Sequence, residues 1–138
     1  MDVVKDTQRA TVRLSYEGKV YKTFRGPQAE ERFANEVRIL RYLERRNCPF
    51  VPRLIEENRA ELQIVTTSAG SRVQHLDPSR AQELFAELEH YGVKHGDADA
   101  RNVTYRSSDG RFCLIDFEYA VITEGPEAGG LTQPEEHR

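Results

Sequence analysis

The sequence of 138 residues has no apolar run close to the roughly 20 residues that a membrane-spanning helix requires. Its start, MDVVKDTQRA, lacks the apolar stretch of a signal peptide. It has only two cysteines, Cys48 and Cys113, too few for a disulfide framework. We therefore expect a cytoplasmic protein with reduced thiols and no membrane partner.

The charge balance argues against a surface that attracts polyanions. Twenty Lys and Arg against 23 Asp and Glu give a net charge of −3, so general binding to nucleic acid or anionic lipid is not expected. Arg38, Arg41 and Arg45 form a basic row on one predicted helix, which leaves an RNA-contacting face as a remote alternative. Neighbouring glutamates dilute the row, so an ordinary solvated face is the preferred interpretation.

Hydrophobic patterning predicts a mixture of strands and helices within a single domain. A chain of this length buries enough surface for one core. Alternation predicts strands, and apolar residues at helical spacing predict helices. The predicted elements are two strands within 11–24 around Glu17-Gly18, a helix from Pro27 to Asn47, strands near 52–57 and 61–67, a helix between Asp77 and Gly92, and a strand at 112–115. This order indicates an α+β fold.

The residues that carry chemistry concentrate in one segment, His95-Gly96-Asp97-Ala98-Asp99-Ala100-Arg101-Asn102, followed by Asp116-Phe117. Asp116 ends an apolar strand, where a carboxylate is costly unless a cation or a donor meets it. Lys22 shares a strand face with Val20 and Phe24, and Glu36 borders the apolar stripe of the first helix.

Each residue alone has a simpler explanation. Lys22 could extend its ammonium to solvent, and Glu36 is by itself more typical of a surface charge. Asp97 and Asp99 could cap a loop, and His95 could be a packed imidazole bonded to the backbone.

In their order, these residues resemble the protein-kinase-like superfamily over residues 10–122. The stretch IDFEYA is similar to that of choline kinases and aminoglycoside-type phosphotransferases, whereas the His-Gly-Asp start is similar to RIO-type and lipopolysaccharide-core kinases. The resemblance implies a two-lobed fold, with an antiparallel-sheet N-lobe and one long helix in 1–67. It also implies a connector and a strongly truncated C-lobe in 68–122. Residues 123–138, rich in Gly, Pro and Glu, predict a disordered tail.

The resemblance also implies an activity and a set of roles. The protein would be an ATP- and Mg²⁺-dependent phosphotransferase acting on a hydroxyl of a protein or a small molecule. Asp97 would orient the hydroxyl and take its proton, assisted by Asn102. The binding roles would fall to Asn102 and Asp116 for Mg²⁺, to Lys22 and Glu36 for the phosphates, and to the backbone of Thr66, Thr67, Ser68 and Ala69 for adenine.

The sequence departs from this family in three ways. Residues 5–12, KDTQRATV, contain no glycine where a glycine-rich loop is expected over the phosphates. Glu118 replaces the glycine of the Asp-Phe-Gly motif, which argues against a mobile switch. The helices that normally follow are absent from the chain, so we expect a homodimer or a partner protein to complete the C-lobe.

Alternatives from other classes remain. The main one is a kinase-like module, catalytically weak or inactive, that binds nucleotide or acts as a scaffold. A hydrolytic metal site at His95, Asp97 and Asp99 lacks a second histidine cluster, and an EF-hand fails at Arg101 and Asn102. The acceptor cannot be read from the sequence.

Overall fold

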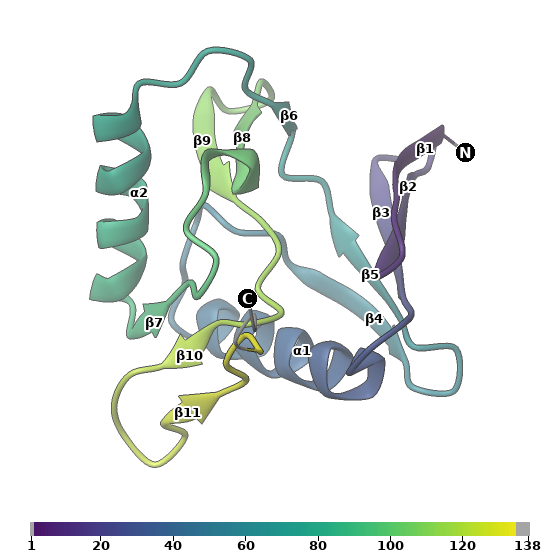
Figure 1. Cartoon of the computed structure of the whole chain (residues 1–138). Coiled ribbons are helices and arrows are strands. Elements are labelled where there is room, and N and C mark those ends of the chain that lie inside the picture. Colours follow the sequence, from purple (N-terminus) through teal and green to yellow (C-terminus); the bar gives the residue numbers. More distant parts are fainter. Residues whose placement is uncertain (1, 135–138) are drawn as a thin grey trace.

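The computed structural model describes residues 2–134, and its largest element is an antiparallel sheet of five strands (Figure 1). The strands lie in the order β1-β2-β3-β5-β4. Their bounds are β1 (Asp2–Asp6), β2 (Ala10–Leu14), β3 (Lys19–Phe24), β4 (Leu54–Asn58) and β5 (Gln63–Thr67). The exposed strand β1 was not predicted, because every one of its residues is exposed and no apolar alternation marks it.

The long helix α1 (Ala29–Arg45) lies beside this sheet and carries the predicted apolar stripe. Phe33, Leu40 and Leu43 on this stripe are fully buried. The helix begins two residues later than predicted because Gln28 adopts a left-handed backbone with φ +57°. A helix with one buried face gains most of its stability from that packing rather than from propensity alone.

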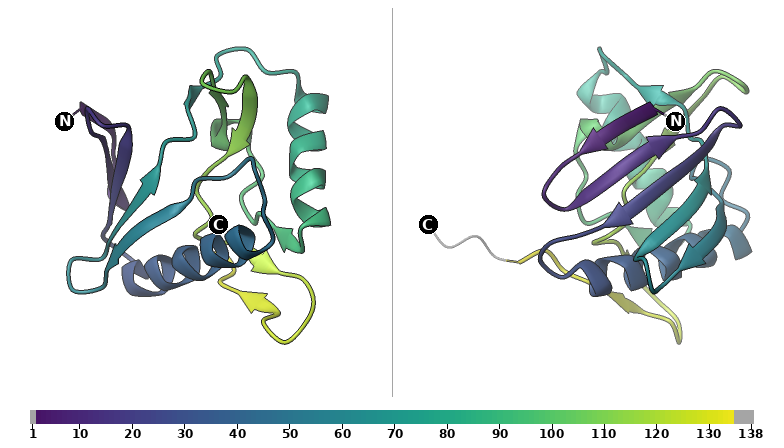
Figure 2. Two further views of the ribbon diagram at one scale, coloured as in Figure 1. Left: turned by 180° about the vertical axis from the view of Figure 1, so that it is seen from behind. Right: turned by 90° about the vertical axis from the view of Figure 1, so that its right-hand side faces the viewer.

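The second part of the chain places helix α2 (Pro78–His90) on the far side of the molecule from β1–β3 (Figures 1 and 2). Asp77 caps it as predicted, since its Oδ1 accepts a hydrogen bond of 2.9 Å from the Ser79 N–H. Two small sheets complete this part. Their strands are β6 (Ser71–Arg72), β8 (Val103–Arg106) and β9 (Arg111–Leu114) in one, and β7 (Val93–Lys94), β10 (Val121–Ile122) and β11 (Gly129–Gly130) in the other.

One hydrophobic core runs through both parts. Side chains of α1 and the main sheet belong to the same buried cluster as Leu84 and Leu88 of α2 and Phe117 after β9. The predicted α+β class is confirmed. No helix in residues 2–134 has the length and apolar character required to span a membrane.

The expectation of a disordered tail from residue 123 is wrong for residues 123–134; residues 135–138 lie outside the described part of the chain. β11 pairs antiparallel with β10, with Gly130 opposite Val121. A Cβ at Gly130 would lie 2.2 Å from the Ala120 carbonyl oxygen, so the glycine that suggested disorder permits close strand pairing instead.

The basic row of α1 is used within the molecule. Arg38 donates to the carbonyl oxygens of Glu127 at 2.8 Å and Gly129 at 2.6 Å. Arg45 pairs with the Glu127 carboxylate at 2.7 Å, and Arg41 pairs with Glu57 at 2.8 Å. All three arginines therefore have partners in this chain.

We predict that Arg38→Gln loosens the segment 123–130, because it removes both charged donors to that backbone. A Glu-specific protease should then cleave after Glu124 and Glu127 severalfold faster, as followed by mass spectrometry. Arg41→Gln is the matched control, since Arg41 contacts Glu57 rather than this segment. Equal cleavage rates in wild type and Arg38→Gln would contradict the prediction.

Candidate functional site

Three of the predicted residues meet at the ammonium of Lys22. Lys22 lies on the inner face of β3 with 5% of its surface exposed. Its Nζ lies 2.7 Å from Oε1 of Glu36 on α1 and 3.1 Å from Oδ1 of Asp116. A fourth group, Oε1 of Glu118, lies 3.2 Å away. The interpretation of Lys22 as a solvent-directed lysine is therefore wrong.

Glu36 connects this lysine to the segment that follows β9. The Glu36 side chain is buried, and its second oxygen, Oε2, accepts a hydrogen bond of 3.0 Å from the Phe117 N–H. The adjacent Asn35 donates to the carbonyl oxygens of Glu118 at 2.8 Å and Ala120 at 2.9 Å. Helix α1 thus holds both the lysine and the backbone after Asp116, and Glu36 is not a surface charge.

Arg32 and Glu118 belong to the same network and were missed in the sequence. Arg32 is fully buried and donates to Oε1 of Glu118 at 3.3 Å and to the carbonyl oxygens of Pro27 at 2.9 Å and Arg9 at 3.2 Å. A signal for Arg32 was present, because it lies four residues before Glu36 and hence on the same helical face. A buried charge requires such partners, since an unpaired one costs several kcal/mol.

The charges shift the pKa values within the network. Burial alone lowers the pKa of Lys22, but Asp116, Glu36 and Glu118 outweigh it and hold that pKa above its ordinary value. Burial alone raises the pKa of Asp116, but Lys22 and Lys5 together lower it to about 2. Burial raises the pKa of Glu36, and Lys22 offsets only part of this effect. At neutral pH, Asp116 is therefore an ionised carboxylate beside two ammonium groups.

Asp97 lies in a loop whose shape depends on Gly96. Gly96 has φ +83°, and a Cβ there would lie 2.0 Å from the Tyr119 carbonyl oxygen, so only glycine fits. The Asn102 side-chain amide donates to the Asp97 carbonyl oxygen at 2.9 Å and to its Oδ2 at 3.2 Å. Asn102 itself is buried, so it fixes the orientation of Asp97 from below the surface.

His95 is a packed imidazole bonded to the backbone, as one alternative had it. Its Nδ1 accepts from the Asp97 N–H at 3.2 Å, so Nε2 carries the proton and donates to the Ile115 carbonyl oxygen at 2.8 Å. The rings of Phe85 and Phe117 each lie 5.1 Å from the imidazole, and burial lowers the pKa of His95. His95 thereby connects the Asp97 loop to the residue before Asp116.

Arg101 covers the carboxylate of Asp97. Its guanidinium lies 2.7 Å and 2.6 Å from the two oxygens of Asp97 and 2.9 Å from Oδ2 of Asp99. The Arg101 side chain is about half exposed, so this ion pair lies at the surface and is weakly held. No role in the site was predicted for Arg101 from the sequence.

Asp97, Arg101 and Asp116 line a polar cleft of about 440 Å³. Its lining comes from the β1–β2 hairpin, from the Asp97 loop and from the segment after β9. Gln133, from the C-terminal segment, donates to the Gly96 carbonyl oxygen at 2.9 Å and lines the cleft as well. The lining residues are Lys5, Thr7, Gln8, Arg9, Ala10, Asp97, Arg101, Asp116, Glu118, Tyr119 and Gln133. The cleft lies within the size range of small-molecule sites.

Asp116 and Asn102 form a donor set suited to Mg²⁺. The Ile115 N–H donates to the Asn102 carbonyl oxygen at 3.0 Å, which holds the two segments side by side. Because Nδ2 of Asn102 is engaged with Asp97, its Oδ1 is the oxygen left for a cation. Residues 2–134 contain no group of three or more His, Cys, Asp or Glu placed to hold a metal, but Mg²⁺ commonly uses one or two protein carboxylates with substrate phosphates and water.

The connector residues lie apart from this cleft. Thr66 is buried on the inner face of the sheet opposite Val20, while the Ala69 carbonyl oxygen accepts a hydrogen bond of 2.5 Å from Thr104. None of Thr66, Thr67, Ser68 and Ala69 lines the cleft. Of the predicted residues, Asp97 and Asp116 line the cleft. Lys22, Glu36 and Asn102 are joined to these two by hydrogen bonds beneath it, whereas the four connector residues are not.

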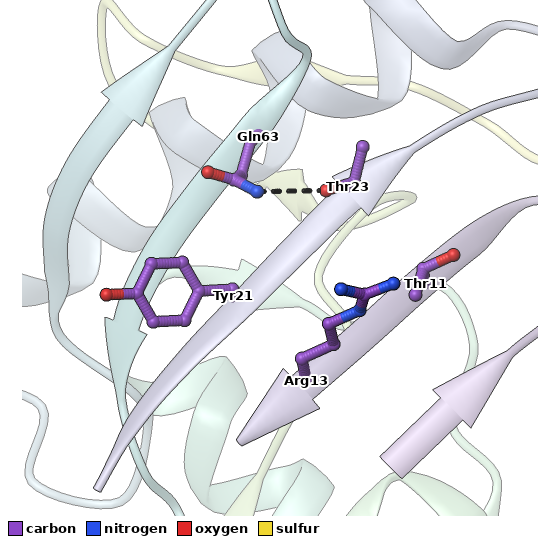
Figure 3. Close-up of a pocket in the computed structure, with 5 residues that line it drawn as sticks. All are labelled: Thr11, Arg13, Tyr21, Thr23 and Gln63. Atoms are coloured by element: carbon purple, nitrogen blue, oxygen red, sulfur yellow. Dashed lines mark hydrogen bonds between the residues drawn. The ribbon is translucent and has the colours of Figure 1, made fainter. Parts of the chain in front are cut away.

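A second hollow, of about 370 Å³, lies on the opposite face of the main sheet (Figure 3). Its lining residues are Thr11, Arg13, Tyr21, Thr23 and Gln63. Gln63 and Thr23 hydrogen-bond to each other at 3.1 Å, as the dashed line shows. Because side chains alternate along β3, this surface faces away from Lys22 and holds none of the predicted residues.

Compared with protein-family models and with curated proteins, the chain matches none. The assignment of a function therefore depends on the geometry described above.

We predict that the protein loses stability as the pH falls below about 6.5 because of His95. Its folded-state pKa is lowered, so the stabilisation is present above the unfolded pKa and is lost as the pH falls through the folded one. The free energy of unfolding should fall by at most about 1.4 kcal/mol per pH unit between pH 7.5 and 5.5 in chemical denaturation.

The variant His95→Gln should flatten this slope, whereas His90→Gln at the exposed end of α2 should retain it. A slope in His95→Gln equal to that of wild type would refute the assignment.

Proposed function

We propose that this protein is an ATP- and Mg²⁺-dependent phosphotransferase of the protein-kinase-like type, acting on a hydroxyl acceptor. The observation that carries the proposal is the buried Lys22 ammonium, held within 3.1 Å by Glu36 and by Asp116, a carboxylate that lines the same cleft as Asp97. A lysine, a glutamate on a helix and a carboxylate after a strand form the arrangement that positions a nucleotide triphosphate in this superfamily.

In the proposed reaction, each residue has one role. Lys22 donates to phosphate oxygens and is oriented by Glu36, while Asp116 and the Oδ1 of Asn102 would hold Mg²⁺. When bound, this ion would neutralise charge on the phosphates. Glu118 pairs with Lys22 and Arg32, which supports a rigid rather than a switching segment after Asp116.

Asp97 is the proposed general base. Its carboxylate accepts the proton of the attacking hydroxyl, and Asn102 keeps it oriented through Nδ2. The guanidinium of Arg101 pairs with both oxygens of this carboxylate. Because that pair is half exposed, Arg101 can leave the carboxylate when an acceptor enters.

The connector Thr66 to Ala69 is the proposed adenine-binding edge, by the resemblance. Thr66 faces the same side of the sheet as Lys22, since it pairs with Val20 two residues along β3. Residues 1–67 and 68–122 are then the two lobes. A second copy or a partner protein would complete the lobe formed by residues 68–122. Within residues 68–134, Tyr105 is the one large apolar side chain that is well exposed.

A second candidate is a kinase-like binding module without transferase activity. The Arg101 guanidinium on both oxygens of Asp97 favours it, as does the absence of glycine in residues 5–12. A thermal-shift assay with ATP, with and without Mg²⁺, separates a nucleotide-binding protein from a pure scaffold. Saturation to 100 times Kd stabilises a protein by about 2.7 kcal/mol, which raises the midpoint measurably.

We predict that Asp97→Asn lowers transfer by about 10²–10⁴-fold, because it removes the base but keeps the shape of the side chain. The measurement is transfer of labelled γ-phosphate, to water or to a surrogate hydroxyl. ATP affinity should stay within about twofold of wild type. Asp99→Asn retains a capping side chain and should transfer at nearly the wild-type rate; undiminished transfer by Asp97→Asn would rule out the proposed base.

We predict that Asp116→Asn weakens ATP binding only when Mg²⁺ is present, by about tenfold or more, since it removes a charged ligand of the ion. Asn is chosen because it tolerates the left-handed backbone of Asp116, φ +63°. Titration calorimetry with and without Mg²⁺ gives the readout. Asp109→Asn, in an exposed turn, is the control, and an unchanged Mg²⁺ dependence in Asp116→Asn would overturn the metal assignment.

A further inference from the structure

Lys5 is a second ammonium group directed at Asp116. Its Nζ lies 3.6 Å from Oδ2 of Asp116, while Lys22 lies on Oδ1 of the same carboxylate. The side chain of Lys5 is 42% exposed, whereas that of Lys22 is 7% exposed. One carboxylate is thus held by a buried lysine from β3 and by an exposed lysine from the edge strand β1.

A bulge in β1 is what points Lys5 inward. Val3 pairs with Arg13, but the next pair is Lys5 with Val12, so Val4 is an extra residue in the strand. Val12 in turn pairs with Lys22 across β2 and β3. Lys5, Val12 and Lys22 therefore lie side by side on the inner face of the sheet. In a regular register Lys5 would pair with Thr11, whose side chain lines the hollow on the outer face.

Of the three cations in the network, Lys5 is the one that is free to move, because it is exposed and the other two are buried. Three carboxylates, those of Glu36, Asp116 and Glu118, face three cations, those of Lys22, Arg32 and Lys5. Lys22 and Arg32 are buried and fixed by several hydrogen bonds. Lys5 has a single partner and a flexible stem that opens onto the cleft.

We propose that Lys5 binds the outer phosphates of the nucleotide. Its side chain supplies the phosphate contacts that the backbone amides of a glycine-rich loop would otherwise make, because residues 5–12 contain no glycine. This inference rests on the proposed function and names a residue for it. An ammonium on a four-carbon stem is a compact cation with three donors, which suits phosphate oxygens. Lys5 lines the cleft, and its Nζ lies 3.6 Å from the carboxylate proposed to hold Mg²⁺. Phosphates bound to that ion would therefore lie within reach of the Lys5 ammonium once it leaves Asp116.

A lysine on an exposed edge strand also has a purely protective role, since it discourages pairing with another chain. A bulge and an inward-pointing charge serve that role as well. The protective role predicts no effect on ligand binding, however, which makes the two roles separable by experiment.

The test measures affinities for adenosine, AMP, ADP, ATP and inorganic tripolyphosphate, with Mg²⁺, by titration calorimetry on the full chain. Lys5→Met removes the charge and keeps the length of the side chain. It should weaken ATP and tripolyphosphate by about tenfold or more, and leave adenosine and AMP within twofold. Lys5→Arg should restore most of the loss. The unchanged AMP affinity also shows that the variant is folded.

Lys19→Met is the matched control, because Lys19 is 41% exposed, pairs with Glu17 and points to the other face of the sheet. It should bind every ligand as wild type does. If ATP binds wild type and Lys5→Met equally, the Lys5 proposal is overturned and the proposed function stands. If wild type binds tripolyphosphate but no nucleotide, the proposed function fails. The Lys5 proposal then depends on whether Lys5→Met binds tripolyphosphate more weakly than wild type does. If wild type binds neither, both are overturned.

Discussion

The two oxygens of Glu36 hold the site together. One accepts from the Lys22 ammonium and the other from the backbone of Phe117, so a single buried carboxylate joins the sheet, the helix and the segment after β9. Removal of one partner from such a pair typically costs about 3–5 kcal/mol, because the other charge is left buried. Arg32, Glu118 and Lys5 balance the remaining charge around it.

A parallel connection holds the loop that carries Asp97. The neutral imidazole of His95 donates to the Ile115 carbonyl oxygen and accepts from the Asp97 N–H, while Asn102 binds Asp97 from the other side. Asp116 lies at the end of both connections with a left-handed backbone, a conformation that non-glycine residues adopt only where surrounding contacts hold them. The ion pairs Lys5–Asp116 and Arg101–Asp97, by contrast, each include an exposed cation, so a ligand that enters the cleft can replace one partner of each pair.

The sequence allowed prediction of the α+β class, of the two helices and of five residues that hydrogen bonds and ion pairs connect in the structure, but Thr66, Thr67, Ser68 and Ala69 do not belong to that network. Periodicity marked the helices because buried faces recur every three or four residues. The order of Lys22, Glu36, Asp97, Asn102 and Asp116 suggested one site, although each had a simpler explanation alone. Composition failed for residues 123–134, because glycine there serves close strand pairing with β10 and arginines of α1 hold the backbone.

The sequence by itself determined which chemical groups the chain has and which local elements carry them, because propensity and periodicity act between near neighbours. Only the tertiary structure decided that Glu36 is buried, that Glu118 and Arg32 neutralise each other, and that Lys5 faces inward. The reason is that burial and charge pairing depend on segments far apart in the sequence, as with Lys22 and Asp116, which are 94 residues apart. The extra residue in β1 moves the Lys5 side chain to the other face of the sheet, and no local sequence pattern in that strand predicts this change.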